Sequence, residues 1–419
     1  MEQLKKPTQI IVSHPTGNAN VRHALQGFVN SNILAQYFTS VAVFEHTFLD
    51  KLSKIGAFSE LKRRFYDASL EQKTKNYPWF EVGRIIAPKI GFPTLTAHES
   101  GIFSTDSCFQ NLDKYVARHL DQFKDLNAVY NYEDTALQTF RKAKKNHLST
   151  FYDLPTGYWK AKAAFIQQEM ERNADWSIAL DAAKDSPEKL RRKDEELSLA
   201  DQVIVASSFT KSTLQHASIK LKKIQVIPYG FPKTYQSRTY QSPKNRKLKA
   251  LFVGRLSQQK GLSYLFEAIA KFSSEIELTL VGSKTTNNFD LLDEHLSKHT
   301  WLPYVRHQEL LKLMREHDFL IFPSLFDGFG LVITESMSQG TPVIATQASA
   351  APDLIENGKN GWIISSGSTD TLVQCLEHII QDKSILEIVG KAALRRAEKR
   401  PWKQYEEELS NTVIGAVRS

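Results

Sequence analysis

The sequence has little cysteine and no long hydrophobic run. Its 419 residues include two cysteines, Cys108 and Cys375, which lie far apart and in no metal-ligand or redox spacing. Disulfides and structural zinc therefore have little support, and a reducing cytoplasm is the expected location. No stretch of about 18 apolar residues occurs, and the charged N-terminus lacks the apolar core of an export signal. The sequence predicts neither a membrane-spanning helix nor an exported protein.

Several functional signatures are also absent. Neither half of the chain opens with the pattern G-x-G-x-x-G followed by an acidic residue about 20 positions on, which argues against a dinucleotide-dependent oxidoreductase. The sequence has no helix-turn-helix, zinc-finger or aromatic-basic RNA-binding signature, so no nucleic-acid partner is expected. No internal repeat of about 20 to 50 residues is present, which disfavours a solenoid.

The composition is that of a soluble globular protein with a basic surface. Apolar residues make up 41% and charged residues 24% of the chain, and the net charge is +8. Basic runs occur at residues 62–64 and 141–145, and they favour anionic lipid headgroups or a phosphorylated acceptor as partners. Ordinary solvated surface is the alternative interpretation of both runs.

Short β-rich runs alternate with helical patterns in the first half of the chain, which is typical of a parallel sheet with crossover helices. The predicted strands are residues 9–13, 40–44, 127–131, 148–152, 202–206 and 224–227. A less regular, helix-leaning stretch at residues 49–123 interrupts them. We expect it to form an insertion beside the acceptor side of a cleft.

The alternation stops at a polar, proline-containing segment and then restarts. The predicted strands of the second half are residues 249–253, 277–281, 318–322, 342–346 and 362–364. The sequence therefore predicts an α/β protein with two domains, because the chain exceeds what one core usually serves and a closed barrel would leave no room for the linker. The expected boundaries are an N-terminal domain at 1–230, a linker at 231–247, a C-terminal domain at 248–401 and a closing helix at 402–419.

In open parallel sheets, ligands bind beyond the carboxyl ends of the strands, so the loops there carry the candidate residues. After the first strand, Gly17 can bring backbone close to a phosphate, although a tight turn alone explains it equally well. Asn18 or Asn20 can cap the helix that follows. After the first strand of the second half, Arg255 and Lys260 precede a helix and together suit a diphosphate. Two solvated surface charges are the alternative.

The densest group of candidate residues lies at 323–345, between two apolar strands. Gly328 and Gly330 keep side chains out of a turn, so the amides of residues 329–331 can face a ligand at the start of a helix. Asp327 precedes the turn and Glu335 lies one helical turn beyond it. Both carboxylates accept hydrogen bonds from hydroxyls, but a capping aspartate and a surface glutamate are the alternative for such a pair.

Several of these motifs occur together and in order. FVGRLSQQKG at 252–261, DGFGLVITE at 327–335, QGTPVIAT at 339–346 and ENGKNGW at 356–362 resemble the retaining glycosyltransferases of family 4, which have the GT-B fold of two facing Rossmann-like domains. The similarity extends across nearly the whole second domain and is thinner in the first. Residues 402–413 resemble the family's closing helix, which crosses back to the first domain.

The resemblance implies a role for each matching residue. Arg255 and Lys260 would hold the diphosphate of a nucleotide-sugar donor, and Glu335 would bind its ribose hydroxyls. Asp327 stands where the family usually has glutamate and would contact the donor sugar. Aspartate is one methylene shorter, so the sugar would sit differently or be a different sugar. The amides of Phe329, Gly330 and Leu331 would support the sugar or phosphate, and Gly17 would approach the diphosphate from the facing domain.

The resemblance further implies a retaining transfer of sugar to a glycan or glycolipid acceptor, with no cofactor. No Asp-x-Asp signature adjoins the motifs, so metal-independent catalysis is expected. Glu133 and Asp153 are the candidates for acceptor contacts, with capping or structural roles as the alternative. We expect a cytoplasmic protein with peripheral contact to an anionic membrane, acting in surface polysaccharide or glycolipid synthesis. A catalytically silent nucleotide-sugar-binding protein, a GT-B epimerase and a glycan phosphorylase remain alternatives.

Overall fold

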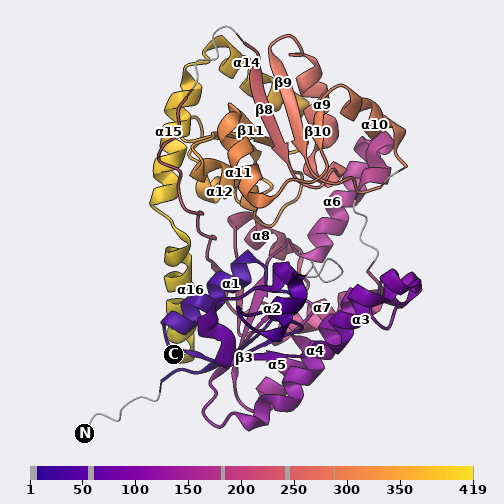
Figure 1. Ribbon diagram of the computed structural model, residues 1–419, viewed down its shortest axis with the longest axis vertical. Helices are drawn as coiled ribbons and strands as arrows, with labels where there is room; N and C mark the ends of the chain where they lie inside the picture. The colour runs from indigo at the N-terminus through magenta and orange to yellow at the C-terminus, as the bar shows by residue number, and fades with distance from the viewer. Residues whose placement is uncertain (1–6, 55–60, 181–184, 241–245, 287, 419) are drawn as a thin grey trace.

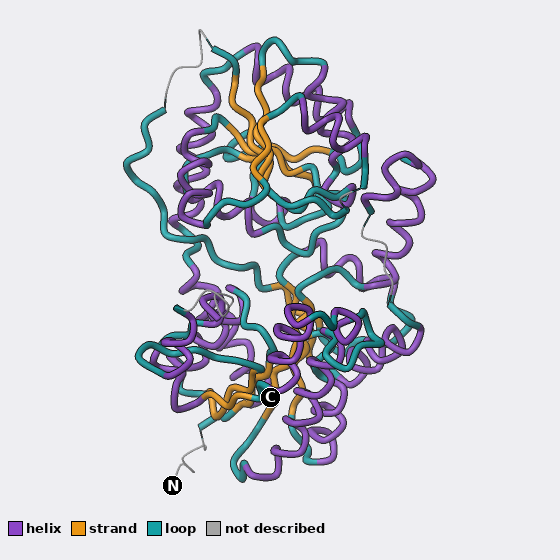
Figure 2. Tube along the Cα trace, turned by 45° about the vertical axis from the view of Figure 1, so that its right-hand side comes forward, coloured by secondary structure: helices purple, strands orange, loops and turns teal. Residues whose placement is uncertain are grey.

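The computed structural model of the protein describes residues 7–54, 61–180, 185–240, 246–286 and 288–418. Two parallel β-sheets lie one above the other along the long axis of the molecule, and helices surround each of them (Figures 1 and 2). The architecture is the α/β fold with two facing Rossmann-like domains that the sequence predicts.

The first sheet has seven strands in the order β3-β2-β1-β4-β5-β6-β7, and all neighbours are parallel. Its strands are β1 (Ile10–Ser13), β2 (Leu34–Thr39), β3 (Thr74–Asn76), β4 (Ala128–Tyr132), β5 (Ser149–Leu154), β6 (Gln202–Val205) and β7 (Ile224–Val226). The central strands are continuous apolar runs because both faces of the sheet are covered. In β1, Ile10 and Val12 join the core cluster that contains residues of α1 and α16, while Ile11 joins the cluster formed with α4, α5 and α7.

The helices of the first half, with the closing helix, are α1 (Ala19–Asn30), α2 (Phe48–Ser53), α3 (Trp79–Ile86), α4 (Thr105–His119), α5 (Leu137–Lys145), α6 (Trp159–Arg172), α7 (Pro187–Leu199), α8 (Ser208–Thr213) and α16 (Trp402–Arg418). Side-chain caps begin three of them: Ser104, Ser186 and Ser207 each accept a hydrogen bond from a backbone N–H of the first turn. No helix within the described part of the chain is both long enough and apolar enough to cross a membrane.

The second sheet has six strands in the order β10-β9-β8-β11-β12-β13, again all parallel. The strands are β8 (Leu248–Val253), β9 (Ile276–Val281), β10 (Thr300–Leu302), β11 (Phe319–Phe322), β12 (Val343–Thr346) and β13 (Trp362–Ile364). The helices are α9 (Leu262–Ala270), α10 (Asp290–Ser297), α11 (His307–Glu316), α12 (Leu331–Ser338), α13 (Ala351–Leu354), α14 (Thr369–Gln381) and α15 (Ile385–Glu398). Residues of α9, α10 and α14 share one buried cluster with the sheet, and residues of α11, α12 and α15 share another.

One predicted strand is wrong, and two observed strands were not predicted. The second strand is Leu34–Thr39 rather than residues 40–44. Val41 and Val43 are buried, but they pack against Leu61 and the loop that carries Phe65, and only Val43 forms an isolated bridge there. The two missed strands, β3 and β10, have three residues each and lie at sheet edges, where a short strand carries little apolar signal.

The predicted insertion and the predicted linker are both closely packed. The stretch at 49–123 supplies β3 to the sheet and α4 to one of its faces. Within the linker, residues 241–245 lie outside the described residues. Arg238 donates hydrogen bonds to the carbonyl oxygens of Met314, His317 and Gln339, and the hydroxyl of Tyr240 donates to the carbonyl of Gly340. The linker is therefore held against the second domain.

Two helical segments cross between the halves. Helix α6 and the 3₁₀ helix η6 (Ala174–Ala179) rise from the first half toward the second (Figure 1), and Trp176 packs against Phe266 and Phe289 in the second core. Helix α16 returns to the first half, where it packs along α1. A Cβ atom on Gly27 of α1 would lie 2.6 Å from the carbonyl oxygen of Glu406 in α16, so this contact requires glycine.

One carboxyl group is buried inside the first domain. Asp153, near the end of β5, is 2% exposed and accepts a hydrogen bond of 2.5 Å from the hydroxyl of Tyr130. Burial raises the pKa of Asp153 from 3.8 to about 7, and the tyrosine hydrogen bond only partly opposes this shift.

The glycine contact gives a test of the α1–α16 packing. Gly27→Ala should destabilise the protein by about 1–3 kcal/mol, because the added methyl meets backbone that cannot rotate away. Gly415→Ala is the control: it lies in α16 with no atom within 4 Å of the added Cβ, and it should stabilise by up to about 1 kcal/mol through helix propensity. Urea unfolding of both variants measures the difference. Equal effects would refute the packing.

Asp153 predicts a pH dependence of stability. Its folded-state pKa lies above its unfolded value of 3.8, so the native state binds the proton more tightly and stability is lost as pH rises through about 7. The loss from this group should be at most about 4 kcal/mol. Asp153→Asn cannot ionise, so its unfolding free energy should fall less between pH 4 and pH 8 than that of the wild type. Parallel profiles in urea titrations would contradict the assignment.

Candidate functional site

A cavity of about 1060 Å³ lies between the two halves, at the carboxyl ends of strands from both sheets. Its volume slightly exceeds the usual range for small-molecule sites and is large enough for a nucleotide sugar. The predicted residues Glu133, Arg255, Lys260 and Asp327 all line it. Its charged lining residues are four cations and three carboxylates: Lys162, Lys193, Arg255, Lys260, Glu133, Asp185 and Asp327.

The two predicted donor-site loops of the second half are joined directly. The Nζ atom of Lys260 forms an ion pair with a carboxylate oxygen of Asp327, and it also lies 5.3 Å from the centre of the Phe322 ring. The backbone N–H of Leu325 donates to the carbonyl of Gln259 at 2.9 Å, and the side chain of Gln259 donates to the carbonyl of Phe326 at 2.8 Å. The loop after β8 and the loop after β11 therefore form one surface of the cavity.

The glycine turn after Asp327 contacts the first domain closely. A Cβ atom on Gly328 would lie 2.2 Å from the carbonyl oxygen of Pro155, and the Gly328 carbonyl accepts hydrogen bonds from the hydroxyls of Ser207 and Thr210. The sequence predicted that Gly328 keeps the turn clear for a ligand. In the structure its lack of a side chain is required by the domain contact.

The amides predicted to face a ligand are not equivalent. The N–H of Phe329 donates to Asp327 Oδ1 at 3.1 Å, and the Phe329 ring is buried against Tyr229. Gly330 has a φ of +81° and is the N-cap of α12, whose first turn contains no acidic residue. Gly330 and the first residue of α12, Leu331, are half-buried. Their position at a helix N-terminus suits an anion better than that of Phe329.

Glu335 does not line the cavity with the other three donor-site candidates. It lies on α12 with its side chain 19% exposed, and its Oε1 is 3.8 Å from Nδ1 of His307. Burial raises the pKa of Glu335, and His307 acts in the opposite direction. A carboxylate that is partly exposed can still accept a hydrogen bond from a hydroxyl.

Glu133 lines the first-domain side of the cavity together with Lys193, which the sequence analysis missed. The Nζ of Lys193 lies 3.7 Å from Glu133 and 3.3 Å from Asp185. Burial would lower the pKa of Lys193, but the carboxylates of Glu133, Asp134 and Asp185 outweigh it and raise that pKa. Lys193 is not recognisable as a cavity residue from the sequence, because it stands in the charged run of α7, which is typical of a solvated helix face.

Two predicted residues lie elsewhere. Asp153 is buried, is not among the residues that line the cavity, and accepts a hydrogen bond from Tyr130, so its position favours the structural alternative. Gly17 has a φ of +65° and lines a different, smaller cavity. Its N–H donates to His14 Nδ1 at 2.8 Å. Burial, and then the charge of Arg64, lower the pKa of His14 to about 3, so this histidine is neutral.

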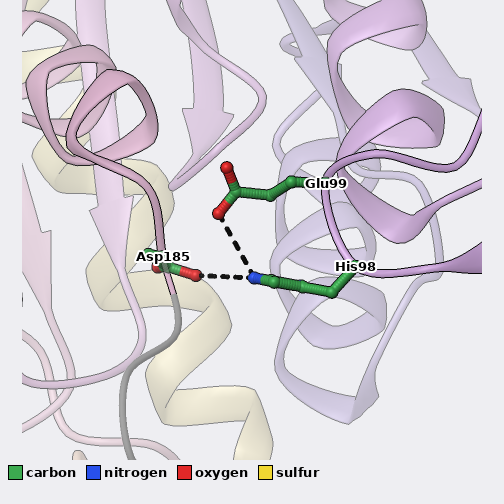
Figure 3. A group of neighbouring side chains, drawn as sticks. All are labelled: His98, Glu99 and Asp185. Carbon is green, nitrogen blue, oxygen red and sulfur yellow. Dashed lines mark ion pairs between the residues drawn. The ribbon is translucent and has the colours of Figure 1, made fainter.

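Three side chains at the edge of the cavity are close enough to share a cation. His98, Glu99 and Asp185 converge from two segments (Figure 3), with His98 Nε2 3.2 Å from Glu99 and 3.4 Å from Asp185. The carboxylate of Asp185 is already paired with Lys189 at 2.9 Å, and Glu99 accepts the backbone N–H of Ser186 at 2.8 Å. The carboxylates of this group are therefore already paired with protein groups. Metal-independent catalysis stays a prediction.

Sequence comparison agrees with the motifs of the second half. Residues 236–396 match the family described as Glycosyl transferases group 1. The D-inositol 3-phosphate glycosyltransferase of Arthrobacter sp. (strain FB24) is 26% identical over 246 residues, which cover 52% of this chain and 58% of that protein. The capsular polysaccharide biosynthesis glycosyltransferase CapM of Staphylococcus aureus is 25% identical over 236 residues, covering 51% and 62%. The matched region thus spans little more than half the length of these relatives.

Structural comparison covers both halves. Sucrose-phosphate synthase from Thermosynechococcus elongatus superposes with a TM-score of 0.66 at 16% identity, over 98% of this chain and 99% of that one. HepE from Anabaena, solved in complex with UDP, gives a TM-score of 0.65 at 17% identity, over 97% and 100%. At these identities the likeness shows the fold. Residues 236–396 are therefore similar to the glycosyl transferases group 1, and the chain as a whole has the GT-B fold.

Proposed function

We propose that the protein is a retaining glycosyltransferase that transfers a hexose from a nucleotide diphosphate sugar to a hydroxyl of a glycan or glycolipid, in surface polysaccharide or glycolipid synthesis. The observation that carries the proposal is the interdomain cavity, where Arg255, Lys260 and Asp327 of the group 1 domain face Glu133 and Lys193 of the first domain. Relatives named for capsular polysaccharide and inositol phosphate glycosylation support the reaction class.

The charge arrangement suits a sugar joined to a diphosphate. Arg255 and Lys260 supply positive charge for the phosphates, while Asp327 supplies acceptor oxygens for sugar hydroxyls. In the structure Asp327 is paired with Lys260. A donor diphosphate would share Lys260 and leave one Asp327 oxygen for the sugar. Donor binding would therefore replace one ion pair with two contacts, one between Lys260 and the diphosphate and one between Asp327 and the sugar hydroxyls.

The same groups would support the transfer step. The bond between the anomeric carbon and the phosphate oxygen breaks, the new bond forms to the acceptor oxygen on the same face, and the departing diphosphate takes the hydroxyl proton. Arg255, Lys260 and the start of α12 would stabilise the charge that develops on the diphosphate. No side-chain base is required for this step, and the histidine that lines the cavity, His98, is paired with Glu99 and Asp185.

Donor binding is tested by thermal unfolding with UDP-, GDP- and ADP-glucose, without added metal. A ligand that binds only the native state raises the midpoint, and 100-fold saturation corresponds to about 2.7 kcal/mol. UDP-glucose comes first because HepE was solved with it. We expect a shift with one nucleotide series that Lys260→Ala and Glu335→Ala abolish, each measured against its own midpoint. Lys359→Ala, which removes an exposed lysine paired with Glu356, should keep the shift.

Turnover separates the proposal from its alternatives. Release of nucleoside diphosphate in the presence of an acceptor, with retention of anomeric configuration in the product, is the expected result. Donor binding with no transfer to any glycan or lipid acceptor would identify a catalytically silent nucleotide-sugar-binding protein. An unfolding midpoint that none of the three nucleotide series changes would refute the proposed donor site.

The proposal includes peripheral docking on an anionic membrane, supported by an exposed apolar surface of the first domain. On α3 and the 3₁₀ helices η3 (Ala87–Ile90) and η4 (Pro93–Thr96), large apolar side chains face outward while the acidic Glu81 is 2% exposed. We call this the α3 surface; its residues are Trp79 (72% exposed), Val82, Ile86, Ile90 (62%), Phe92 (56%) and Leu95. It lies across the first domain from α16 (Figure 1). With the net charge of +8, a bilayer rich in anionic lipid is its occupant.

Vesicle sedimentation tests the docking. Vesicles of phosphatidylglycerol should retain the wild type at low salt better than vesicles of phosphatidylcholine. The double variant Trp79→Ser, Ile90→Ser should bind the anionic vesicles more than about tenfold more weakly, since each apolar side chain contributes about 1.5–3 kcal/mol when buried. Ile388→Ser removes an equally exposed isoleucine from α15 and should bind as the wild type does. Equal retention of both variants would contradict the assignment.

A further inference from the structure

A second cavity, of about 370 Å³, lies in the first domain and shares none of its lining residues with the interdomain cavity. We call it the arginine pocket. Its lining residues are Thr16, Gly17, Asn18, Ala19, Arg22, Arg63, Arg64 and Arg84. Four of these eight are arginines and none is acidic. The pocket combines three distant parts of the chain: the loop before α1 with its first turn, the residues before β3, and α3.

The guanidinium groups are held in place by neighbours that lie outside the pocket lining. Arg64 and Arg84 both form ion pairs with the buried carboxylate of Glu81. Burial opposes ionisation of Glu81, but Arg84 and Arg64 outweigh it and lower its pKa, so the carboxylate is charged. The pocket lining itself therefore carries an excess of positive charge, with four arginines, no acidic residue, and Glu81 pairing two of the four from outside the lining. This excess favours an anion in the pocket.

Arg22 is fixed between backbone and an aromatic ring. Its Nη2 donates to the carbonyl oxygen of Arg63, and its guanidinium carbon lies 5.4 Å from the centre of the Tyr66 ring. Its Nε is buried and has no hydrogen-bond partner among the described residues. A buried charged donor without an acceptor is costly, so negative charge near this guanidinium group is favoured.

The start of α1 adds backbone donors. His14 Nδ1 accepts the N–H groups of Thr16 and Gly17, which fixes the loop in a conformation that turns back on the histidine. Asn18 stands at the N-cap, but its side chain makes no capping hydrogen bond, and the first turn holds no acidic residue. The 12-residue helix thus presents the positive end of its dipole to the pocket without a side-chain cap.

We propose that the arginine pocket binds the phosphate group of a phosphate-ester acceptor, so that the acceptor is recognised by this group; the acceptor role rests on the proposed transferase function. The donor diphosphate has its own cations, Arg255 and Lys260, in a cavity with no residue in common. Guanidinium groups match phosphate oxygens in pairs, and four of them suit a dianion better than a carboxylate. A soluble sugar phosphate and a phospholipid headgroup share this chemistry.

Inorganic phosphate is the direct probe. At constant ionic strength adjusted with chloride, phosphate should raise the unfolding midpoint of the full chain, and calorimetric titration should give its affinity. Arg63→Gln should weaken phosphate binding by about tenfold or more. The Arg63 side chain is exposed and Arg22 uses only its backbone carbonyl, so the fold is retained. Lys62→Gln removes the adjacent exposed cation, which does not line the pocket, and should bind phosphate as the wild type does.

The same variants separate this proposal from that of the donor site. UDP should bind Arg63→Gln as tightly as the wild type, and UDP and phosphate should stabilise the wild type additively. Mutually exclusive binding, or equal loss of UDP and phosphate binding in Arg63→Gln, would assign the pocket to the donor and overturn the proposal. Phosphate binding that depends on Arg63 in a protein that binds no nucleotide would leave the pocket standing and refute the transferase.

Transfer assays then distinguish the two sources of the phosphate. With a labelled donor, glucose 6-phosphate yields a water-soluble product, whereas phosphatidylglycerol vesicles yield a product that sediments with lipid. Either product should form less efficiently with Arg63→Gln, through a higher KM for the acceptor and an unchanged KM for the donor. Equal KM values in Arg63→Gln and Lys62→Gln for both acceptors would overturn the acceptor assignment.

Discussion

The arrangement of the whole site depends on one close contact between the domains, the approach of Gly328 to the carbonyl of Pro155. No side chain fits there, because a Cβ atom would lie 2.2 Å from that oxygen. The Gly328 carbonyl is fixed by the hydroxyls of Ser207 and Thr210, and Ser207 also caps α8. Asp327 comes immediately before this contact, so the position of its carboxylate in the cavity, and of Lys260 paired with it, follows from the docking of the turn.

Aromatic side chains pack on both sides of the turn that contains Gly328. Phe326, next to the turn, packs against Phe165 of α6 and Phe209 of α8, with ring centres 5.7 and 5.1 Å away. On the other side, Phe329 packs against Tyr229, which also contacts Trp402 at the start of α16. The turn therefore lies between the two segments that cross between the halves. A change in the relative orientation of the domains would alter these aromatic contacts. The turn and the cavity would therefore change together.

The sequence predicts the fold well where apolar runs are long and both faces of a sheet are buried. It fails where a tertiary contact replaces a local pattern: the buried valines at 41 and 43 read as a strand but pack under a loop. The motif loops also determine which donor-site residues meet, since Arg255, Lys260 and Asp327 share one cavity. Burial of Asp153 was not predictable, because a carboxylate after a strand has the same local sequence whether it faces a ligand or a tyrosine hydroxyl.

The arginine pocket illustrates a further limit of sequence reading. Its cations come from positions 22, 63, 64 and 84, and only the run at 62–64 is visible as a pattern. On α3 the acidic Glu81 is buried and paired with Arg64 and Arg84, whereas the large apolar side chains are exposed. The buried carboxylate and the exposed apolar side chains have one cause. When Glu81 faces the interior to pair with two arginines, the opposite face of α3 is turned to the surface.

The two cavities differ in the chemistry that each can recognise. The interdomain cavity has cations and carboxylates in nearly equal number, so it can accept hydrogen bonds from sugar hydroxyls and also hold a diphosphate. The arginine pocket has four guanidinium groups and no acidic side chain, so its side chains offer a sugar few acceptor atoms. A ligand that offers only hydroxyls would accept weaker hydrogen bonds there, while a phosphate would form stronger hydrogen bonds between oppositely charged groups on several sides. The division of charge between the cavities therefore favours a phosphate, and not a second sugar, as the group bound in the first domain.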